Sequence, residues 1–160
     1  MTLTPDQLAQ QCADTMWQTD HCSQAMGMMI TDVGAGWATL TMVVRQDMLN
    51  GQQICHGGVI FTLADSAFAF ACNAYNQFTV AQHCNISFLK PVKYNDQLTA
   101  SATERSREGR SGIYDVVVTQ SDGTVVAEFR GFSRAVRGHI VHDDDTNASA
   151  SVCVEQEHSA

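Results

Sequence analysis

Asn50-Gly51-Gln52-Gln53-Ile54-Cys55-His56-Gly57-Gly58 is a polar stretch that leads directly into an apolar segment. The apolar segment contains no proline, and we predict that it forms a helix over residues 58–75. Its apolar side chains point almost all round such a helix, so the helix must be buried on most sides. The rest of the chain therefore has to wrap around it.

The start of this helix and one acid inside it are the strongest candidates for chemistry. The first turn of a helix leaves N–H groups unpaired at the positive end of the helix dipole. Gly57 and Gly58 would present those groups to a bound carbonyl, and Asp65 lies seven residues after Gly58. Such N–H groups stabilise an oxyanion, and a nearby carboxylate acts as an acid or base. Alternatively, Asp65 caps a loop or a strand, and the glycines form an ordinary turn that needs positive φ.

Other polar residues surround these candidates. His56 could transfer a proton or support the loop. Asn50 could orient water or a substrate carbonyl, although Asn-Gly is chiefly a turn signal. Thr62 and Ser66 share the polar stripe of the helix with Asp65, where they could bond that carboxylate or the preceding backbone turn.

Common catalytic and metal-binding motifs are otherwise missing from the sequence. The chain has no GxSxG, no phosphate-binding GxxxxGK and no GxGxxG motif. Cys55 and His56 are adjacent but lack the spaced partners of a zinc site. We therefore expect no metal.

Strand signals fill most of the remaining chain. A helix that begins at Thr4-Pro5-Asp6 is expected to run to about Trp17, and a short one covers residues 23–26. Strands are predicted over residues 28–33, 37–45, 79–89, 97–106, 112–121 and 124–136. These elements predict an α+β fold in which a curved antiparallel sheet of five or six strands wraps around one long central helix. We divide the chain into an N-terminal helical segment (1–26), the wrapped domain (27–137) and an acidic, disordered tail (138–160).

Charge and composition narrow the classes of partner. The chain has 160 residues, a net charge of −8 and 44% hydrophobic residues, which suits one globular domain. Its basic residues all lie between Arg45 and Arg137, and they are too few for a general nucleic-acid binder. We find no signal peptide or membrane-length apolar run, and the six cysteines show no CxxC pairing. We therefore expect a cytoplasmic protein with reduced thiols and with neither nucleic-acid nor membrane partners.

A family resemblance follows from the motif Leu49-Asn50-Gly51 … Cys55-His56-Gly57-Gly58 … Leu63-Ala64-Asp65 … Ala67. The motif resembles that of the hotdog-fold acyl-CoA thioesterases, and it is most similar to their phenylacetic-acid-degradation (PaaI) type. The resemblance covers roughly residues 12–137, through Ile86-Ser87-Phe88-Leu89-Lys90-Pro91, Gly112-Ile113-Tyr114-Asp115 and Phe129-Arg130-Gly131. It departs at Val80-Ala81-Gln82, which lacks the hydroxyl that relatives carry near the start of this strand.

The resemblance implies a hotdog fold that pairs into a homodimer and then a homotetramer, with the active site at the dimer interface. Asp65 would come from one subunit, while Asn50, His56, Gly57 and Gly58 would come from the other. The implied reaction is hydrolysis of acyl-CoA thioesters, often hydroxylated phenylacetyl-CoA or a similar aryl-acyl-CoA. No metal or organic cofactor is implied.

Two further sets of residues are expected to contact the substrate. The acyl group would enter an apolar pocket lined by Leu49, Phe61, Thr62 and Phe68. The CoA phosphates would lie near Lys90, Arg110, Arg134 and Arg137.

Two other functions stay open at this point. A hotdog hydratase or dehydratase acting on enoyl thioesters would use His56 as its base. A non-catalytic acyl-CoA-binding module would bind its ligand without turnover. We would expect such a module to carry an effector domain, and this chain is too short to hold one.

Overall fold

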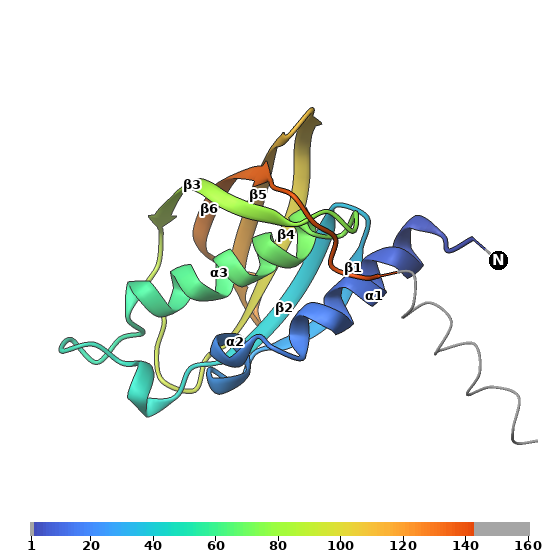
Figure 1. The fold of residues 1–160 in the computed structure, drawn as a ribbon. Helices are drawn as coiled ribbons and strands as arrows, with labels where there is room; N and C mark the ends of the chain where they lie inside the picture. The colour runs from blue at the N-terminus through green and yellow to red at the C-terminus, as the bar shows by residue number, and fades with distance from the viewer. Residues whose placement is uncertain (1, 143–160) are drawn as a thin grey trace, which may run out of the picture.

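The computed structural model describes residues 2–142, which form one six-stranded antiparallel sheet that curves around helix α3 (Figure 1). The strands lie in the order β1-β2-β4-β5-β6-β3. The helices are α1 (Pro5–Trp17), α2 (His21–Ala25) and α3 (Gly57–Cys72), with a short 3-10 helix, η1, at Gln46–Met48. The strands are β1 (Met29–Gly34), β2 (Trp37–Val43), β3 (Thr79–Phe88), β4 (Gln97–Glu108), β5 (Ser111–Gln120) and β6 (Val125–Ala135). The predicted α+β fold with a wrapped central helix is confirmed.

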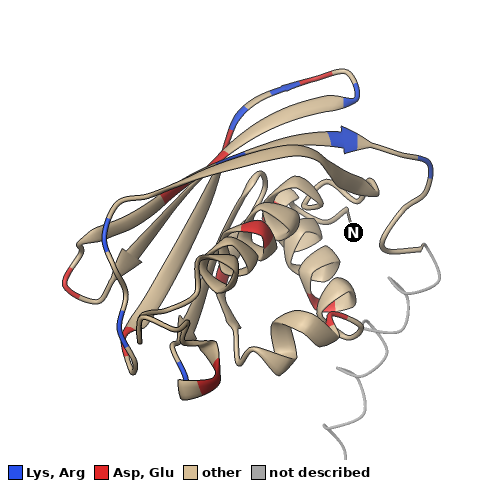
Figure 2. Cartoon of the chain, turned by 90° about the vertical axis from the view of Figure 1, so that its left-hand side faces the viewer, with Lys and Arg blue, Asp and Glu red and all other residues tan. Residues whose placement is uncertain are grey.

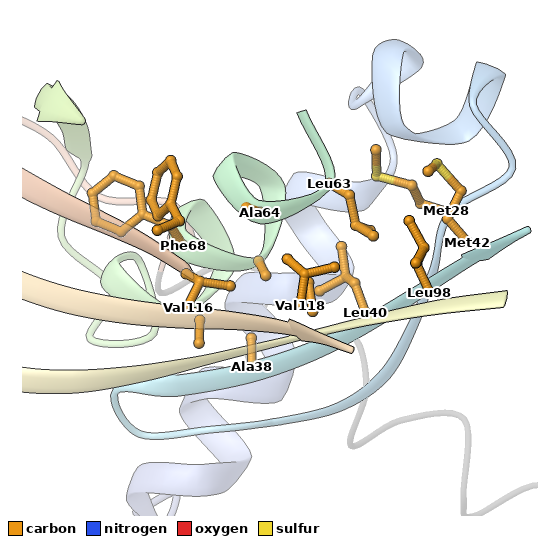
Figure 3. Packing of buried hydrophobic residues seen from close by; sticks show 14 of the residues in the cluster. Met28, Ala38, Leu40, Met42, Leu63, Ala64, Phe68, Leu98, Val116 and Val118 are labelled. Carbon is orange, nitrogen blue, oxygen red and sulfur yellow. The ribbon is translucent and has the colours of Figure 1, made fainter. Parts of the chain in front are cut away.

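Helix α3 forms the centre of the core because its side chains are apolar on nearly every face. Leu63, Ala64 and Phe68 are fully buried and pack against the sheet (Figure 3). The Phe68 ring lies so close to β6 that a Cβ added at Gly131 would come within 2.8 Å of it, so this position requires glycine. The ring centroid of Phe68 is also 5.6 Å from that of Tyr114. The structure therefore places Phe68 in the core. The prediction that this residue lines a substrate pocket is wrong.

The end of α3 comes earlier than the predicted boundary at Tyr75. The side-chain amide of Asn73 donates to the Thr79 carbonyl, and its side-chain oxygen accepts from the Thr79 N–H, both at 2.9 Å. These bonds end the helix at Cys72 and turn the chain back into β3. No helix within residues 2–142 is both long and apolar enough to cross a membrane.

Strand β3 forms one open edge of the sheet and follows α3 along its length. Asn73, just after α3, bonds Thr79, while Gly57 at the start of α3 lies against Phe88 at the other end of β3. Most of the strand is exposed, and Val80 and Phe88 are 50% and 52% accessible. A ten-residue edge with exposed apolar side chains is a template for pairing with another strand.

The segment after β6 differs from the tail predicted to begin at residue 138. Ile140 and Val141 are buried and pack against Cys12 of α1. Asn76 holds them in place: its side-chain oxygen accepts from both backbone N–H groups, at 2.9 and 2.7 Å, and its side-chain amide donates to the Val141 carbonyl at 3.0 Å. We call residues 138–142 the C-terminal strap. The rest of the predicted tail, residues 143–160, lies outside the described residues.

Asn76→Gly tests how the strap is held. Glycine accepts the observed φ of 57° at this position but makes none of the three side-chain bonds. We expect the free energy of unfolding to fall by about 2–4 kcal/mol, because each lost bond costs about 1 kcal/mol. Urea unfolding at fixed protein concentration measures the change. Gln46→Ala, at an exposed position, serves as the control, and an unchanged stability for Asn76→Gly would show that these bonds do not hold the strap.

Candidate active site

His56 caps the N-terminus of α3 with its side chain. Its Nδ1 accepts a hydrogen bond from the Gly58 N–H at 2.9 Å, which satisfies one of the unpaired donors at the helix start. The Gly57 N–H has no acceptor within residues 2–142. Of the two predicted oxyanion donors, the structure therefore leaves Gly57 free and shows Gly58 already occupied.

Gly57 and Gly58 are needed because neighbouring side chains leave little room for a Cβ, and not because the backbone adopts a conformation that only glycine accepts. Neither Gly57 nor Gly58 has positive φ, so the alternative of an ordinary positive-φ turn is wrong. A Cβ on Gly57 would lie 3.0 Å from Cζ of Phe88, and a Cβ on Gly58 would lie 3.1 Å from Nδ1 of His56. Without a side chain, the Gly57 amide stays accessible beside the Phe88 ring.

Asn50 closes the loop that precedes α3. Its side-chain oxygen accepts from the Gln52 N–H at 2.9 Å, and its own backbone N–H donates to the Ile54 carbonyl at 2.8 Å. This is the turn that the Asn-Gly pair predicts. The side-chain NH2 of Asn50 makes no hydrogen bond within residues 2–142, so it is available to a ligand.

Asp65 is half-buried and makes no hydrogen bond or ion pair within residues 2–142. Burial raises the pKa of its carboxyl. The other members of the polar stripe are engaged elsewhere: Thr62 donates to the Gly58 carbonyl at 2.7 Å, and the Ser66 hydroxyl bonds the Ser23 hydroxyl at 2.9 Å. The interpretation of Asp65 as a loop or strand cap is therefore wrong. The carboxylate is held on α3, and no group within residues 2–142 is bonded to it.

Cys72 and Cys84 lie near Asp65. The sequence analysis did not predict this proximity. Burial and then the Asp65 charge raise the pKa of Cys72 to about 12 and that of Cys84 to about 11. Both are therefore neutral thiols at neutral pH and poor nucleophiles. Because Cys84 belongs to β3, its coupling to Asp65 places that carboxylate on the side of α3 toward this strand. Within residues 2–142, no three His, Cys, Asp or Glu side chains gather as a metal site.

Asp65 and the Gly57 amide cannot act on the same group within a single chain. They are eight positions apart on α3, which is about 12 Å along the axis at 1.5 Å per residue. A reacting carbonyl must lie about 3 Å from its donor and within one water molecule of the base. The predicted site is therefore incomplete in one chain, which agrees with a site shared between subunits.

A cavity of about 350 Å³ opens at the start of α3. Its wall includes Asn50, Gly57 and Lys90, so the structure brings together three residues predicted for the site. Phe88 also lines it and was missed, although it stands inside the motif that carries the family resemblance. Phe88 stands at the end of β3, just before the loop with Pro91, and this position could have indicated that it lines a site.

The remaining residues predicted for the acyl pocket do not line this cavity. Leu49 is half-buried and pairs with Cys55 in an isolated β-bridge. Phe61 is also half-buried, and its ring centroid lies 5.4 Å from that of Phe129. In the single chain, Leu49 and Phe61 pack against the hydrophobic core.

The four predicted phosphate-binding residues divide between the two ends of β3. Lys90 follows one end and lines the cavity. Arg134 is in register with Val80 near the other end, where Arg110 donates to the backbone at the end of β6 and Arg137 follows that strand. Figure 2 shows basic segments at separate places on the chain. One chain therefore does not gather these four residues.

Comparison with known proteins assigns the family. The model of the Thioesterase superfamily matches residues 52–127. The chain is 43% identical over 132 residues to the acyl-coenzyme A thioesterase PaaI of Escherichia coli (strain K12), which covers 82% of this chain and 94% of that relative. The chain belongs to the thioesterase superfamily. This thioesterase is thus an enzyme that hydrolyses thioesters, as the resemblance implies.

Solved structures also match this thioesterase. The E. coli PaaI protein from the phenylacetic acid degradation operon superposes with a TM-score of 0.84 and 41% identity, covering 85% of this chain and 99% of that one. A variant of the phenylacetic acid degradation protein PaaI from Thermus thermophilus gives a TM-score of 0.71 and 32% identity, covering 73% and 100%. The predicted hotdog fold and PaaI-type resemblance are confirmed.

The hydrogen bond that His56 accepts from the Gly58 N–H argues against a hydratase, because a hydratase would use His56 as its base. Because Nδ1 accepts from the Gly58 N–H, the proton of a neutral His56 ring is assigned to Nε2. In this tautomer the ring has no free lone pair with which to remove a proton. His56 therefore supports the helix start and offers an Nε2–H donor.

The raised pKa of Asp65 predicts how the stability of this thioesterase depends on pH. The folded chain holds this proton more tightly than the unfolded chain, so its contribution to stability is present at low pH. The contribution is lost as pH rises from the ordinary carboxyl value of 3.8 through the raised folded pKa. We therefore expect Asp65→Asn to have a higher Tm than the wild type at neutral pH, and the gain to shrink on acidification.

Thermal unfolding of both proteins across this pH range measures the difference. Glu128→Gln, on an exposed position of β6, is the control and should show no gain that disappears in acid. A wild type more stable than Asp65→Asn at neutral pH would contradict the desolvation of this carboxyl.

Proposed function

We propose that this thioesterase hydrolyses acyl-CoA thioesters at a site formed by two copies of the chain, with phenylacetyl-type aryl-acyl groups as its preferred substrates. The proposal is carried by two groups beside the open strand β3, for neither of which residues 2–142 supply a hydrogen-bond partner. They are the half-buried Asp65 carboxyl, whose charge acts on Cys84, and the Gly57 amide, which lies against Phe88. The choice of acyl group is supported by the E. coli relative, which is named an acyl-coenzyme A thioesterase and comes from a phenylacetic acid degradation operon.

Pairing through β3 would bring the two groups to one substrate. A two-fold axis across this edge sets the two β3 strands antiparallel, so the Phe88 end of one lies toward the Thr79 end of the other. Because α3 follows β3, the two α3 helices then run antiparallel side by side. The partner subunit's Asp65 thereby approaches the Gly57 amide of the first subunit. The second open edge, β1, is at the opposite side of the sheet.

The homodimer is the catalytic unit in this proposal. Two such dimers associate into a homotetramer, as in the family that the sequence resembles. The site itself requires only the two copies that meet at β3.

The reaction follows from the positions of the two groups. The thioester carbonyl oxygen accepts a hydrogen bond from the Gly57 N–H, where the helix dipole also stabilises negative charge. The partner subunit's Asp65 removes a proton from a water molecule, and the water oxygen bonds to the acyl carbon. The C–S bond then breaks, the CoA sulfur leaves with the proton, and the free acid remains. The raised pKa suits Asp65 to this task because it brings the base nearer to neutral pH.

Asp65 has a second possible route, in which its carboxylate attacks the acyl carbon and forms a mixed anhydride. A single turnover in isotopically labelled water separates the two routes, because only the covalent route places solvent oxygen on the enzyme's own carboxylate. In either route the Asn50 NH2 and the His56 Nε2–H are available to hold the substrate or the water, and His56 lies beside the departing sulfur.

Asp65→Asn tests the central claim. We expect kcat for phenylacetyl-CoA to fall by about 10²–10⁴-fold, the usual contribution of a general base, while acyl-CoA binding and the fold stay intact. Thiol release recorded with a trapping reagent measures turnover, and calorimetry measures binding. Glu128→Gln is the matched control. Full activity in Asp65→Asn would remove the proposal, and loss of enoyl absorbance without thiol release from an enoyl-CoA would identify a hydratase instead.

Gly57→Pro tests the oxyanion donor by removing the N–H. Proline is tolerated at the first position of a helix, and the preceding His56, at φ −61° and ψ 132°, has the extended conformation that proline requires before it. We expect kcat to fall by about 10²–10³-fold. Gly57→Ala adds the same Cβ beside the Phe88 ring but keeps the donor, so it should lose much less. Equal losses in the two variants would assign the effect to crowding and not to the amide.

A further inference from the structure

A groove of about 330 Å³ lies between helix α1 and strand β1, at the edge of the sheet opposite β3. Near the start of α1, Asp6 accepts a hydrogen bond at 2.9 Å from the N–H of Ala35, just after β1. At the end of α1, Trp17 lines the groove together with Met29, the first residue of β1. Helix α1 therefore lies along β1 (Figure 1). The proposed active site uses no residue of this groove.

The groove combines an open strand edge with apolar side chains. Four consecutive residues of β1, Met29–Asp32, line it, so the edge of the strand itself faces the groove. Within residues 2–142, β1 pairs only with β2, and such an edge strand leaves alternate backbone N–H and C=O groups without a partner. Trp17 and Ile30 are half-buried, and Met29 is 61% accessible. An extended segment in this groove would gain both backbone hydrogen bonds and apolar contact.

Two exposed acids, Asp14 of α1 and Asp32 of β1, line the groove from its two sides. Neither makes an ion pair within residues 2–142. Residues 1–44 contain four aspartates and no lysine or arginine, and the first basic side chain, that of Arg45, pairs with Asp47. The groove therefore carries negative charge without an ion-pair partner in the described part of the chain. Such a surface favours a cationic occupant.

The same charge argues against two occupants that the chain itself could supply. A second copy that paired through its own β1 edge would bring the acids of the two grooves together, and like charges oppose such pairing. Residues 143–160 contain five acids and no lysine or arginine, so they do not complement the groove either. A basic segment of another protein complements both the charge and the open edge.

We propose that this groove binds an extended segment of a partner protein in which lysine or arginine alternates with apolar residues, and that the segment pairs with β1 as an added strand. Its backbone bonds the open edge, an apolar side chain contacts Trp17 and Ile30, and basic side chains pair with Asp14 and Asp32. Because β1 and β3 are opposite edges of the sheet, the partner binds away from the proposed catalytic groups. The inference does not depend on the proposed function.

Fluorescence anisotropy of a labelled peptide that alternates lysine and valine tests the docking. We expect the wild type to bind this peptide and not to bind one with glutamate in place of lysine. Asp14→Lys combined with Asp32→Lys should weaken binding at least about tenfold, because two attractive pairs become repulsive. Glu108→Lys combined with Glu128→Lys is the control, since it makes the same charge change at exposed positions of β4 and β6. Equal losses in the two double variants would overturn the proposal.

Backbone methylation of the lysine peptide separates strand pairing from charge attraction alone. An added strand turns alternate N–H groups toward β1, so N-methyl groups on one alternate set of residues should abolish binding, while those on the other set should not. Both methylated peptides keep every charge and side chain. Equal affinities of these two peptides, or no binding of the unmodified one, would overturn the proposal.

Sedimentation velocity of the wild type and of the Asp14→Lys, Asp32→Lys variant tests whether the groove is instead an interface between copies of this chain. We expect the two proteins to have the same oligomeric state. A change of oligomeric state in the variant would assign the groove to such an interface and would overturn the proposal.

Discussion

An apolar helix inside an antiparallel sheet is the constraint on which the rest of this structure depends. Most side chains of α3 are apolar and must be buried, so six strands curve around the helix. Phe68 packs so tightly that only glycine fits opposite it at residue 131. Strand β3, which follows α3 in sequence, is thereby placed at an edge beside β6. The polar stripe with Asp65 faces the side where the sheet ends. Burial of the helix and partial exposure of its acid are two results of the same packing.

The start of α3 gives its two glycine amides different tasks. The Gly58 N–H is satisfied by Nδ1 of His56, whereas the Gly57 N–H beside Phe88 finds no acceptor in the part of the chain that the structure describes. An aspartate is a more common cap, but its negative charge would oppose an oxyanion forming one residue away. A neutral imidazole caps the helix without that repulsion. The cap also fixes the tautomer of His56, which connects the local structure of the helix start to the choice between hydrolysis and hydration.

The sequence predicted those features whose causes are local or periodic. The apolar pattern predicted α3 and the sheet, and the glycine pair predicted the helix start that the structure places at Gly57. The roles of Gly57 and Asp65 in catalysis stay predictions. Features that depend on distant contacts were missed or misplaced. Phe68 differs from a pocket residue only through its neighbours on β5 and β6, and the separation of Lys90 from Arg134 follows from the register of β3. The strap was predicted to be part of a disordered tail. Its two apolar residues are buried against Cys12, which lies over a hundred residues away, and no local pattern indicates that contact.

The order of the strands also has a consequence for the synthesis of this chain. Within residues 2–142, strand β3 pairs only with β6, whose first residue comes 37 positions after the last residue of β3. The strap packs against a helix near the N-terminus. While the ribosome is still translating the intervening residues, β3 has no strand partner, and α3 can pack only against elements that precede it, such as β1 and β2. The fold therefore closes only when nearly the whole described chain has emerged, and a nascent chain stalled before β6 leaves the side of α3 toward β6 uncovered, as an apolar surface open to aggregation.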